Sequence, residues 1–158
     1  MNIAWLPQAA LPVAVSIAAR WVREQERTAL RHGVPLSPDQ LADARLVGVS
    51  RPEHVRLMRV ASVAKFEHPL FKPIALVTSP LFAQTAGLTA RYGILIRSDC
   101  WGDRALLVHE LAHVAQYERL GGVRPFLRTY LQECREHGYP LGALEREAAQ
   151  IATTICAG

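Results

Sequence analysis

The sequence has few cysteines, no CxxC pair and no repeated or low-complexity segment. Three cysteines among 158 residues cannot all be bridged within one chain. This count favours a reducing compartment, or at least a fold that does not depend on disulfides. Biased tracts and long runs of charge are also absent from the sequence. Composition therefore gives no reason to expect disorder.

Lysine is scarce, and the positive charge is not concentrated in one segment. The formal net charge of +4 includes 18 basic residues, of which only two are lysines, and they are scattered along the chain. A nucleic-acid-binding protein more often gathers its basic residues on one face or in one segment. We therefore expect a solvated basic surface and no nucleic-acid partner.

The apolar residues 1–20 lack the features of a signal peptide and of a membrane span. No basic region precedes the apolar stretch, and Pro7, Gln8 and Pro12 interrupt it. A secretory signal needs a basic start, and a transmembrane helix needs about 20 predominantly apolar residues. We expect a helix-forming arm in a cytoplasmic protein without a stable membrane span; a membrane-associated anchor is the alternative.

Apolar spacing and capping residues predict two helices in the first part of the chain. Apolar residues recur at helical spacing from Pro12 onward, and Gly33 followed by Pro35 ends this segment. Ser37 and Pro38 suit the N-cap and the first position of a second helix.

The middle of the sequence predicts a small sheet. Residues 51–64 suit either a short helix or a strand, and prolines divide residues 68–80 into a loop with one short strand. Residues 85–99 predict two strands joined by a turn at "ARYG", which includes Gly93.

The last third of the sequence predicts three helices. Asp99 or Asp103 can cap the first, which runs to the stop signal at Gly121. The second begins near Arg124, and the third covers residues 143–155. Helices, a small sheet and three further helices make an α+β fold.

Half of the residues are apolar, which suits one compact domain with a single core. We expect a single domain over residues 1–158. A mainly helical N-terminal region, residues 1–60, would pack on or beside a core formed by residues 61–158.

The first of the three C-terminal helices contains the sequence HELAH, residues 109–113. On a helix, His109 and His113 lie one turn apart, about 40° around the axis, and Glu110 lies within the same arc. Two neutral imidazoles at this spacing can bind one Zn²⁺ at about 2.0–2.1 Å. The carboxylate beside them can take a proton from a water that the metal has made acidic. The pattern predicts a zinc site with Glu110 as general base.

The opposite face of this helix supports a buried site. Leu107, Leu111 and Val114 face away from the histidines, and a helix that is apolar on both sides belongs in the interior. Burying two histidines and a glutamate is costly unless a partner satisfies them, and a metal with its water satisfies all three. The alternative is a pair of hydrogen-bonded core histidines, with Glu110 reaching solvent.

A catalytic zinc site normally has three protein ligands, so a third ligand must come from elsewhere. Four further histidines lie outside any recognisable ligand spacing: His32, His54, His68 and His137. The candidates are Glu145 and Glu147, which flank the apolar stripe of the last helix on opposite sides. Small neighbours, Ala149 and Ala152, favour Glu145 as the inward-facing ligand, with Glu147 as the alternative.

HExxH followed by a helical glutamate resembles the gluzincin zinc metallopeptidases. The pieces "GLTARYGILIR", "HELAHVAQYERLGGVRPFLRTYL", "HGYP" and "LEREA" resemble more closely a group of small bacterial HExxHxxQ proteins of unknown substrate. The resemblance implies a zincin-like minimal metalloprotease core, made of an active-site helix, a small sheet and a C-terminal ligand helix. It also implies zinc bound by His109, His113 and Glu145.

The sequence departs from the gluzincin pattern at one position. Ala149 stands where those families usually carry an acidic residue that orients a ligand histidine. Such orienting residues matter for metal affinity and for activity. Glu147 is the candidate that could replace it.

Three further features have candidate supporting roles. The strand "GILIRS", residues 93–98, is expected to bind the substrate backbone as a sheet edge, or to be an ordinary strand. Tyr139 could stabilise a tetrahedral oxyanion, or cap a turn between helices. Gln116, one turn past His113, is expected to hydrogen-bond a ligand or the adjoining loop.

These features together predict a zinc-dependent metallopeptidase that acts on a peptide or protein substrate. Its general base would be Glu110, which takes a proton from water and delivers it to the leaving amine. The alternative is a zinc-binding structural or interaction module with little or no catalytic activity.

Overall fold

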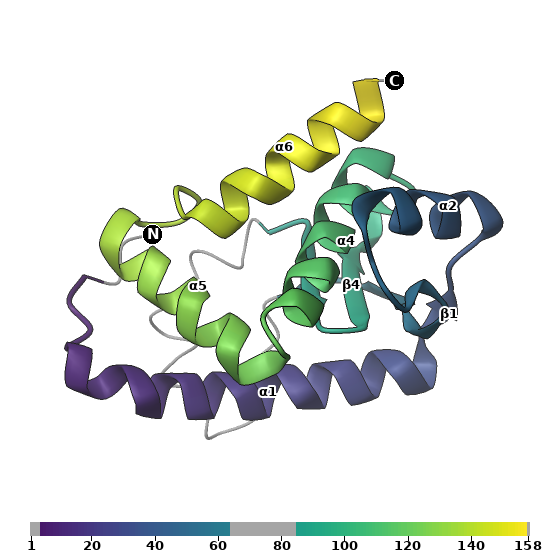
Figure 1. Cartoon of the computed structure of the whole chain (residues 1–158). Coiled ribbons are helices and arrows are strands. Elements are labelled where there is room, and N and C mark those ends of the chain that lie inside the picture. Colours follow the sequence, from purple (N-terminus) through teal and green to yellow (C-terminus); the bar gives the residue numbers. More distant parts are fainter. Residues whose placement is uncertain (1–3, 64–84, 158) are drawn as a thin grey trace.

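The computed structural model describes residues 4–63 and 85–157, and it has the expected α+β architecture. Helices surround one small mixed sheet (Figure 1). The helices are α1 (Leu11–His32), α2 (Pro38–Val47), α4 (Arg104–Arg119), α5 (Val123–His137) and α6 (Ala143–Ala157). The strands are β1 (Val34–Pro35), β2 (Arg56–Val60), β3 (Gly87–Ala90) and β4 (Gly93–Arg97). The predicted loop with one strand at residues 68–80, and His68, lie outside the described residues.

Side-chain caps account for where two of the helices begin. Ser37 and Gln40 form a reciprocal capping box at the start of α2, as the Ser37–Pro38 signal predicted. The Asp103 side chain accepts the Leu106 amide at 3.0 Å and caps α4. Asp99 instead binds the Arg97 guanidinium at 2.6 Å, so it is not the cap.

The sheet has the strand order β1-β2-β4-β3, in which β2 and β4 are parallel and the other pairs are antiparallel. Residues 51–64, which suited either a helix or a strand, contain a short 3₁₀ turn followed by β2. The predicted strand–turn–strand unit is confirmed as β3, a turn at Arg91 and Tyr92, and β4.

The expectation that "GILIRS" forms a sheet edge is wrong, because β4 lies between β2 and β3. Its apolar side chains are buried on both faces of the sheet. Leu95 packs with α1 and α5 side chains, whereas Ile94 and Ile96 pack with α2 and α4 side chains. A continuous apolar run of this kind is typical of an interior strand. Within the described residues, β3 is the strand that ends the sheet on the α4 side.

Helices cover both faces of this sheet. The predicted apolar face of α4 is confirmed, since Leu107, Leu111 and Val114 are buried together with Ile94 and Ile96. Helix α1 runs along one side of the molecule and α6 lies on the opposite side, with α4 between them (Figure 1). The contacts between α4 and α6 are extensive, and they create the site described below.

The N-terminal 60 residues contribute to the sheet as well as to the helical layer. Their strands β1 and β2 pair with each other, and β2 also pairs with β4. Helix α1 packs against α5 and against the sheet. Among the helices of residues 4–63 and 85–157, none combines the length and the apolar character needed to cross a bilayer.

Candidate metal centre

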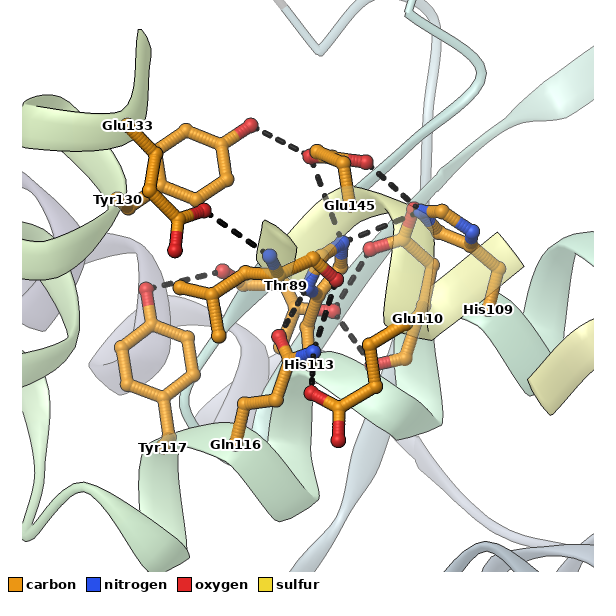
Figure 2. Close-up of polar contacts among 11 residues, drawn as sticks. Thr89, His109, Glu110, His113, Gln116, Tyr117, Tyr130, Glu133 and Glu145 are labelled. Atoms are coloured by element: carbon orange, nitrogen blue, oxygen red, sulfur yellow. Dashed lines mark hydrogen bonds and ion pairs between the residues drawn. The ribbon is translucent and has the colours of Figure 1, made fainter. Parts of the chain in front are cut away.

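Helices α4 and α6 bring together two histidines and one glutamate (Figure 2). One ligand atom from each of His109, His113 and Glu145 lies within 4.8 Å of the others. The two histidine Nε2 atoms are 3.1 Å apart. Glu145 Oε2 lies 3.3 Å from His109 Nε2, and Glu145 Oε1 lies 3.6 Å from His113 Nε2. Among the glutamates considered from sequence, Glu145 is the one placed between both imidazoles.

The arrangement fits a zinc ion. Ligands about 2.0–2.1 Å from a tetrahedral ion lie about 3.3 Å from one another. The two Nε2 atoms are 3.1 Å apart, and each lies 3.3 or 3.6 Å from a different oxygen of Glu145, so the spacing is close to that of a zinc site. Two imidazole nitrogens and one carboxylate oxygen are a common catalytic zinc set. His113 and Glu145 are buried, and basic atoms converging in a buried site need a proton or a cation between them.

Glu145 is held in place by a tyrosine of α5. The Tyr130 hydroxyl donates to Glu145 Oε1 at 2.6 Å. Burial raises the pKa of Tyr130 well above 10, which keeps this hydroxyl a donor. Burial also acts to raise the pKa of Glu145, but the adjacent His109 and His113 side chains and the Tyr130 hydrogen bond outweigh it and hold the pKa well below 4.5. Glu145 is therefore an ionised carboxylate that points at the histidines.

His113 is held from its other side by Gln116. Gln116 is buried, and its Oε1 lies 2.8 Å from His113 Nδ1. Its amide nitrogen reaches the Leu144 carbonyl at the start of α6, at 2.9 Å. Gln116 therefore bonds a candidate metal ligand, whereas its second partner lies at the start of α6 and not in an adjoining loop.

Glu147 lies apart from the two imidazoles and has other partners. Its carboxylate binds the Arg119 guanidinium through contacts of 2.8 and 2.7 Å, and it accepts the Gln116 amide at 2.8 Å. The hydrogen bond from Arg119 is the main cause that lowers the pKa of Glu147. The structure thus separates the two candidate glutamates: Glu145 faces the histidines, and Glu147 braces Gln116.

Glu110 is enclosed between α4 and the strand β3. Its Oε2 lies 2.7 Å from the Thr89 hydroxyl, which also lies 2.9 Å from the Glu110 carbonyl oxygen. A Cβ atom at Gly87 would come within 2.6 Å of Glu110 Oε1, so only glycine leaves room for the carboxyl group. Glu110 is 5% exposed, and the alternative in which it reaches solvent is therefore wrong.

The environment of Glu110 favours proton uptake. Burial raises its pKa, while the charges of His113 and His109 and the Thr89 hydrogen bond oppose that rise. The charges of the two histidines therefore act directly on the Glu110 carboxyl group. A carboxyl group with a raised pKa beside a metal-binding cluster is a candidate acid–base residue.

Tyr139 lies in the segment between α5 and α6 and is half-buried. Burial raises its pKa to about 12, and the charges of Glu145 and Glu110 contribute. The phenol therefore keeps its proton at neutral pH, within the electrostatic influence of these two carboxylates.

Several residues of the site were not identified from the sequence. Thr89, Gly87 and Tyr130 come from elements that are distant in sequence from their partners. For Tyr130, one local signal existed: it follows Phe126 by one helical turn, and the two rings stack at 5.6 Å on the face of α5 that carries Phe126. Glu133 was also missed; it caps α6 by accepting the Leu144 amide at 2.9 Å.

The remaining residues singled out from the sequence lie outside the site. His32, His54 and His137 are exposed, as expected for surface histidines. Arg91 occupies the β3–β4 turn with φ of 56°, and the Tyr92 hydroxyl donates to Glu118 of α4 at 2.9 Å. Both therefore serve the turn and its packing.

Comparisons with models of protein families, with curated proteins and with solved structures gave no match. The chemistry of the metal centre is therefore argued from its own residues and geometry.

Proposed function

We propose that this protein is a zinc-dependent metallopeptidase in which His109, His113 and Glu145 hold the metal. The observation that supports this most strongly is the convergence of their ligand atoms within 4.8 Å, next to the buried carboxyl group of Glu110. Zinc, when bound by such a set, supplies Lewis-acid chemistry: it acidifies water and polarises a carbonyl group.

The chain's own residues supply the proton transfers. Glu110 takes a proton from the attacking water onto its carboxylate and later delivers it to the leaving amine. Its raised pKa suits a group that must both accept and release a proton. The Thr89 hydroxyl holds Oε2 of this carboxylate in place. Tyr139, still protonated at neutral pH, donates to the oxyanion that develops on the substrate carbonyl.

A peptide is the substrate that best suits the surroundings of Glu110. Among the described residues, β3 is paired by β4 on one side only, and it is the strand on which Glu110 packs. An extended peptide can add to such an edge through main-chain hydrogen bonds. This would place the scissile bond beside the carboxyl group of Glu110.

The unpaired cysteines support a reducing compartment for this activity. Cys100, Cys134 and Cys156 form no disulfide, and burial raises the pKa of the Cys134 thiol to about 12. Thiols kept reduced are typical of the cytoplasm. We therefore place the peptidase there.

The decisive comparison is between the wild type and Glu110→Gln. Both proteins should contain equal zinc by elemental analysis, and only the wild type should cleave an unstructured protein or a peptide library. Glu24→Gln, at an exposed position on α1, is the matched control and should keep full activity. Activity that survives in Glu110→Gln would contradict the role of Glu110.

A second candidate function is a zinc-stabilised module without catalysis. One observation favours it: the three ligands join α4 to α6, so a bound metal would tie these two helices together. This alternative predicts full zinc content, a large loss of thermal stability on zinc removal, and no cleavage by either protein.

A further inference from the structure

We propose that Gln116 is a positioning residue that fixes the tautomer of His113, and that Glu147 and Arg119 lock Gln116 in the orientation this requires. The inference rests on the proposed metal site. It assigns the role of orienting His113 to a neutral amide on the same helix.

The orientation of the Gln116 amide follows from its partners. The nitrogen of this amide has two hydrogens, and it faces the Leu144 carbonyl at 2.9 Å and Glu147 Oε2 at 2.8 Å. Both partners can only accept, because one is a carbonyl and the other is an ionised carboxylate. If the amide were flipped, its oxygen would face two acceptors at hydrogen-bond distance. The oxygen must therefore face His113.

The tautomer of His113 follows from the orientation of this amide. Gln116 Oε1 lies 2.8 Å from His113 Nδ1, and an amide oxygen can only accept. His113 must therefore carry a hydrogen on Nδ1. In the neutral ring this leaves the lone pair on Nε2, which is the atom that faces His109 and Glu145. The ring is thereby prepared as a metal ligand before any metal binds.

Glu147 and Arg119 allow only one orientation of the Gln116 amide. The Arg119 guanidinium donates to both carboxylate oxygens of Glu147, at 2.8 and 2.7 Å. The carboxylate therefore stays an acceptor and cannot donate to the Gln116 amide. This chain of contacts runs from the half-exposed Arg119–Glu147 pair to the buried imidazole.

The same contacts explain how the site can dispense with an acidic residue at Ala149. Ala149 is exposed on α6. Gln116, in contrast, lies on α4, the same helix as His113, and contacts the Nδ1 atom of that histidine. Glu147, two residues before Ala149, supplies the negative charge. The Gln116 side-chain amide connects this carboxylate to His113. His113 thus receives an orienting partner without a second carboxylate buried beside the ligands, which would have to be desolvated.

The tautomer can be observed directly in the full chain labelled with ¹⁵N-histidine. Long-range ¹H–¹⁵N NMR at a pH where His113 is neutral should show hydrogen on Nδ1 and a pyridine-like Nε2 in the metal-free protein. Zinc addition should move the Nε2 resonance and leave Nδ1 protonated. A metal-free ring that carries its hydrogen on Nε2 would overturn the proposal, whether or not the protein cleaves peptides.

Variants then test the locking residues by competition for Zn²⁺ with a chelator. Gln116→Ala should weaken zinc binding roughly 10- to 100-fold and give a mixture of tautomers. Glu147→Ala, at the half-exposed end, should weaken it less, and the double variant should match Gln116→Ala because both residues act through one contact. Gln150→Ala, an exposed glutamine one turn beyond Glu147, is the control.

The outcomes separate this inference from the proposed function. If Gln116→Ala does not fold, the wild-type tautomer and Glu147→Ala still decide the matter. Unchanged zinc affinity in both Gln116→Ala and Glu147→Ala would overturn the positioning role. Absent peptidase activity together with an Nδ1-protonated His113 and weakened zinc binding in the variants would refute the peptidase and support the inference.

Discussion

The Tyr130 hydroxyl of α5 donates to Glu145 Oε1 of α6 at 2.6 Å, so the proposed carboxylate ligand is oriented by a third helix. Tyr130→Phe removes this bond and keeps the ring that stacks on Phe126. We expect the variant to fold and to bind zinc about tenfold more weakly, because its ligand carboxylate loses its orienting partner. Zinc competition with a chelator measures the change. Wild-type affinity in Tyr130→Phe would show that this hydroxyl does not orient Glu145.

Tyr139→Phe should have the opposite pattern of effects. Its phenol is proposed to act on the substrate oxyanion, so its loss should lower kcat about 100-fold or more. Zinc affinity should not change, since Tyr139 is not assigned to the metal. Steady-state kinetics and the same zinc competition, run beside Tyr130→Phe, distinguish the two tyrosines. A fall in zinc affinity with unchanged kcat would contradict the assignment.

Gly87→Ala should displace the general base without touching the metal ligands. The added Cβ would lie 2.6 Å from Glu110 Oε1 and 2.9 Å from its Cδ, so the carboxyl group must move. We expect kcat to fall about 100-fold with zinc content unchanged. The double variant Gly87→Ala/Glu110→Gln should be no slower than Glu110→Gln alone. An additive loss in the double variant would mean that Gly87 acts on something else.

The strand β3 illustrates why part of the site could not be read from the sequence. Gly87 and Thr89 lie next to Glu110 although they precede it by more than 20 positions in the sequence. No local sequence pattern predicts contacts over that separation. The edge assigned to "GILIRS" was wrong for the same reason: strand order depends on β2, which precedes β4 by about 35 residues. A run buried on both faces was the available signal for an interior strand.

Features that lie within a single helix were easier to predict from the sequence. The HELAH spacing places His109 and His113 one turn apart on α4, and their Nε2 atoms do approach to 3.1 Å. Ser37 and Asp103 cap their helices through contacts within four residues. Of the two small residues that favoured Glu145 as the inward-facing ligand, Ala152 is buried but Ala149 is exposed. The hydrogen bond from Tyr130 to Glu145 could not be predicted, because local residue patterns do not determine how α5 lies relative to α6.

A buried carboxyl group that is not a candidate metal ligand predicts a pH-dependent stability. Burial raises the pKa of Glu26 above 4.5, while the Arg91 charge and the Tyr92 amide oppose the rise. A carboxyl group with a raised folded-state pKa stabilises the fold below its unfolded value and loses that contribution as the pH rises through the folded value. Glu26→Gln removes this titration. Its free energy of unfolding relative to wild type should therefore increase from below pH 4.5 toward neutral pH.

Urea unfolding of the metal-free proteins at several pH values measures this difference. Glu24→Gln, exposed on the same helix, is the control for the loss of a carboxyl group from α1. Parallel pH curves for Glu26→Gln and wild type would show that Glu26 has no raised pKa in the folded chain.

The zinc content of three proteins tests the central claim most directly: wild type, Glu145→Gln and Glu147→Gln. Each is purified with zinc, desalted and analysed for metal per chain. The metal centre described here predicts about one zinc per chain in the wild type, most of it kept in Glu147→Gln and most of it lost in Glu145→Gln. A wild type without zinc, or equal retention by the two variants, would contradict a site built from His109, His113 and Glu145.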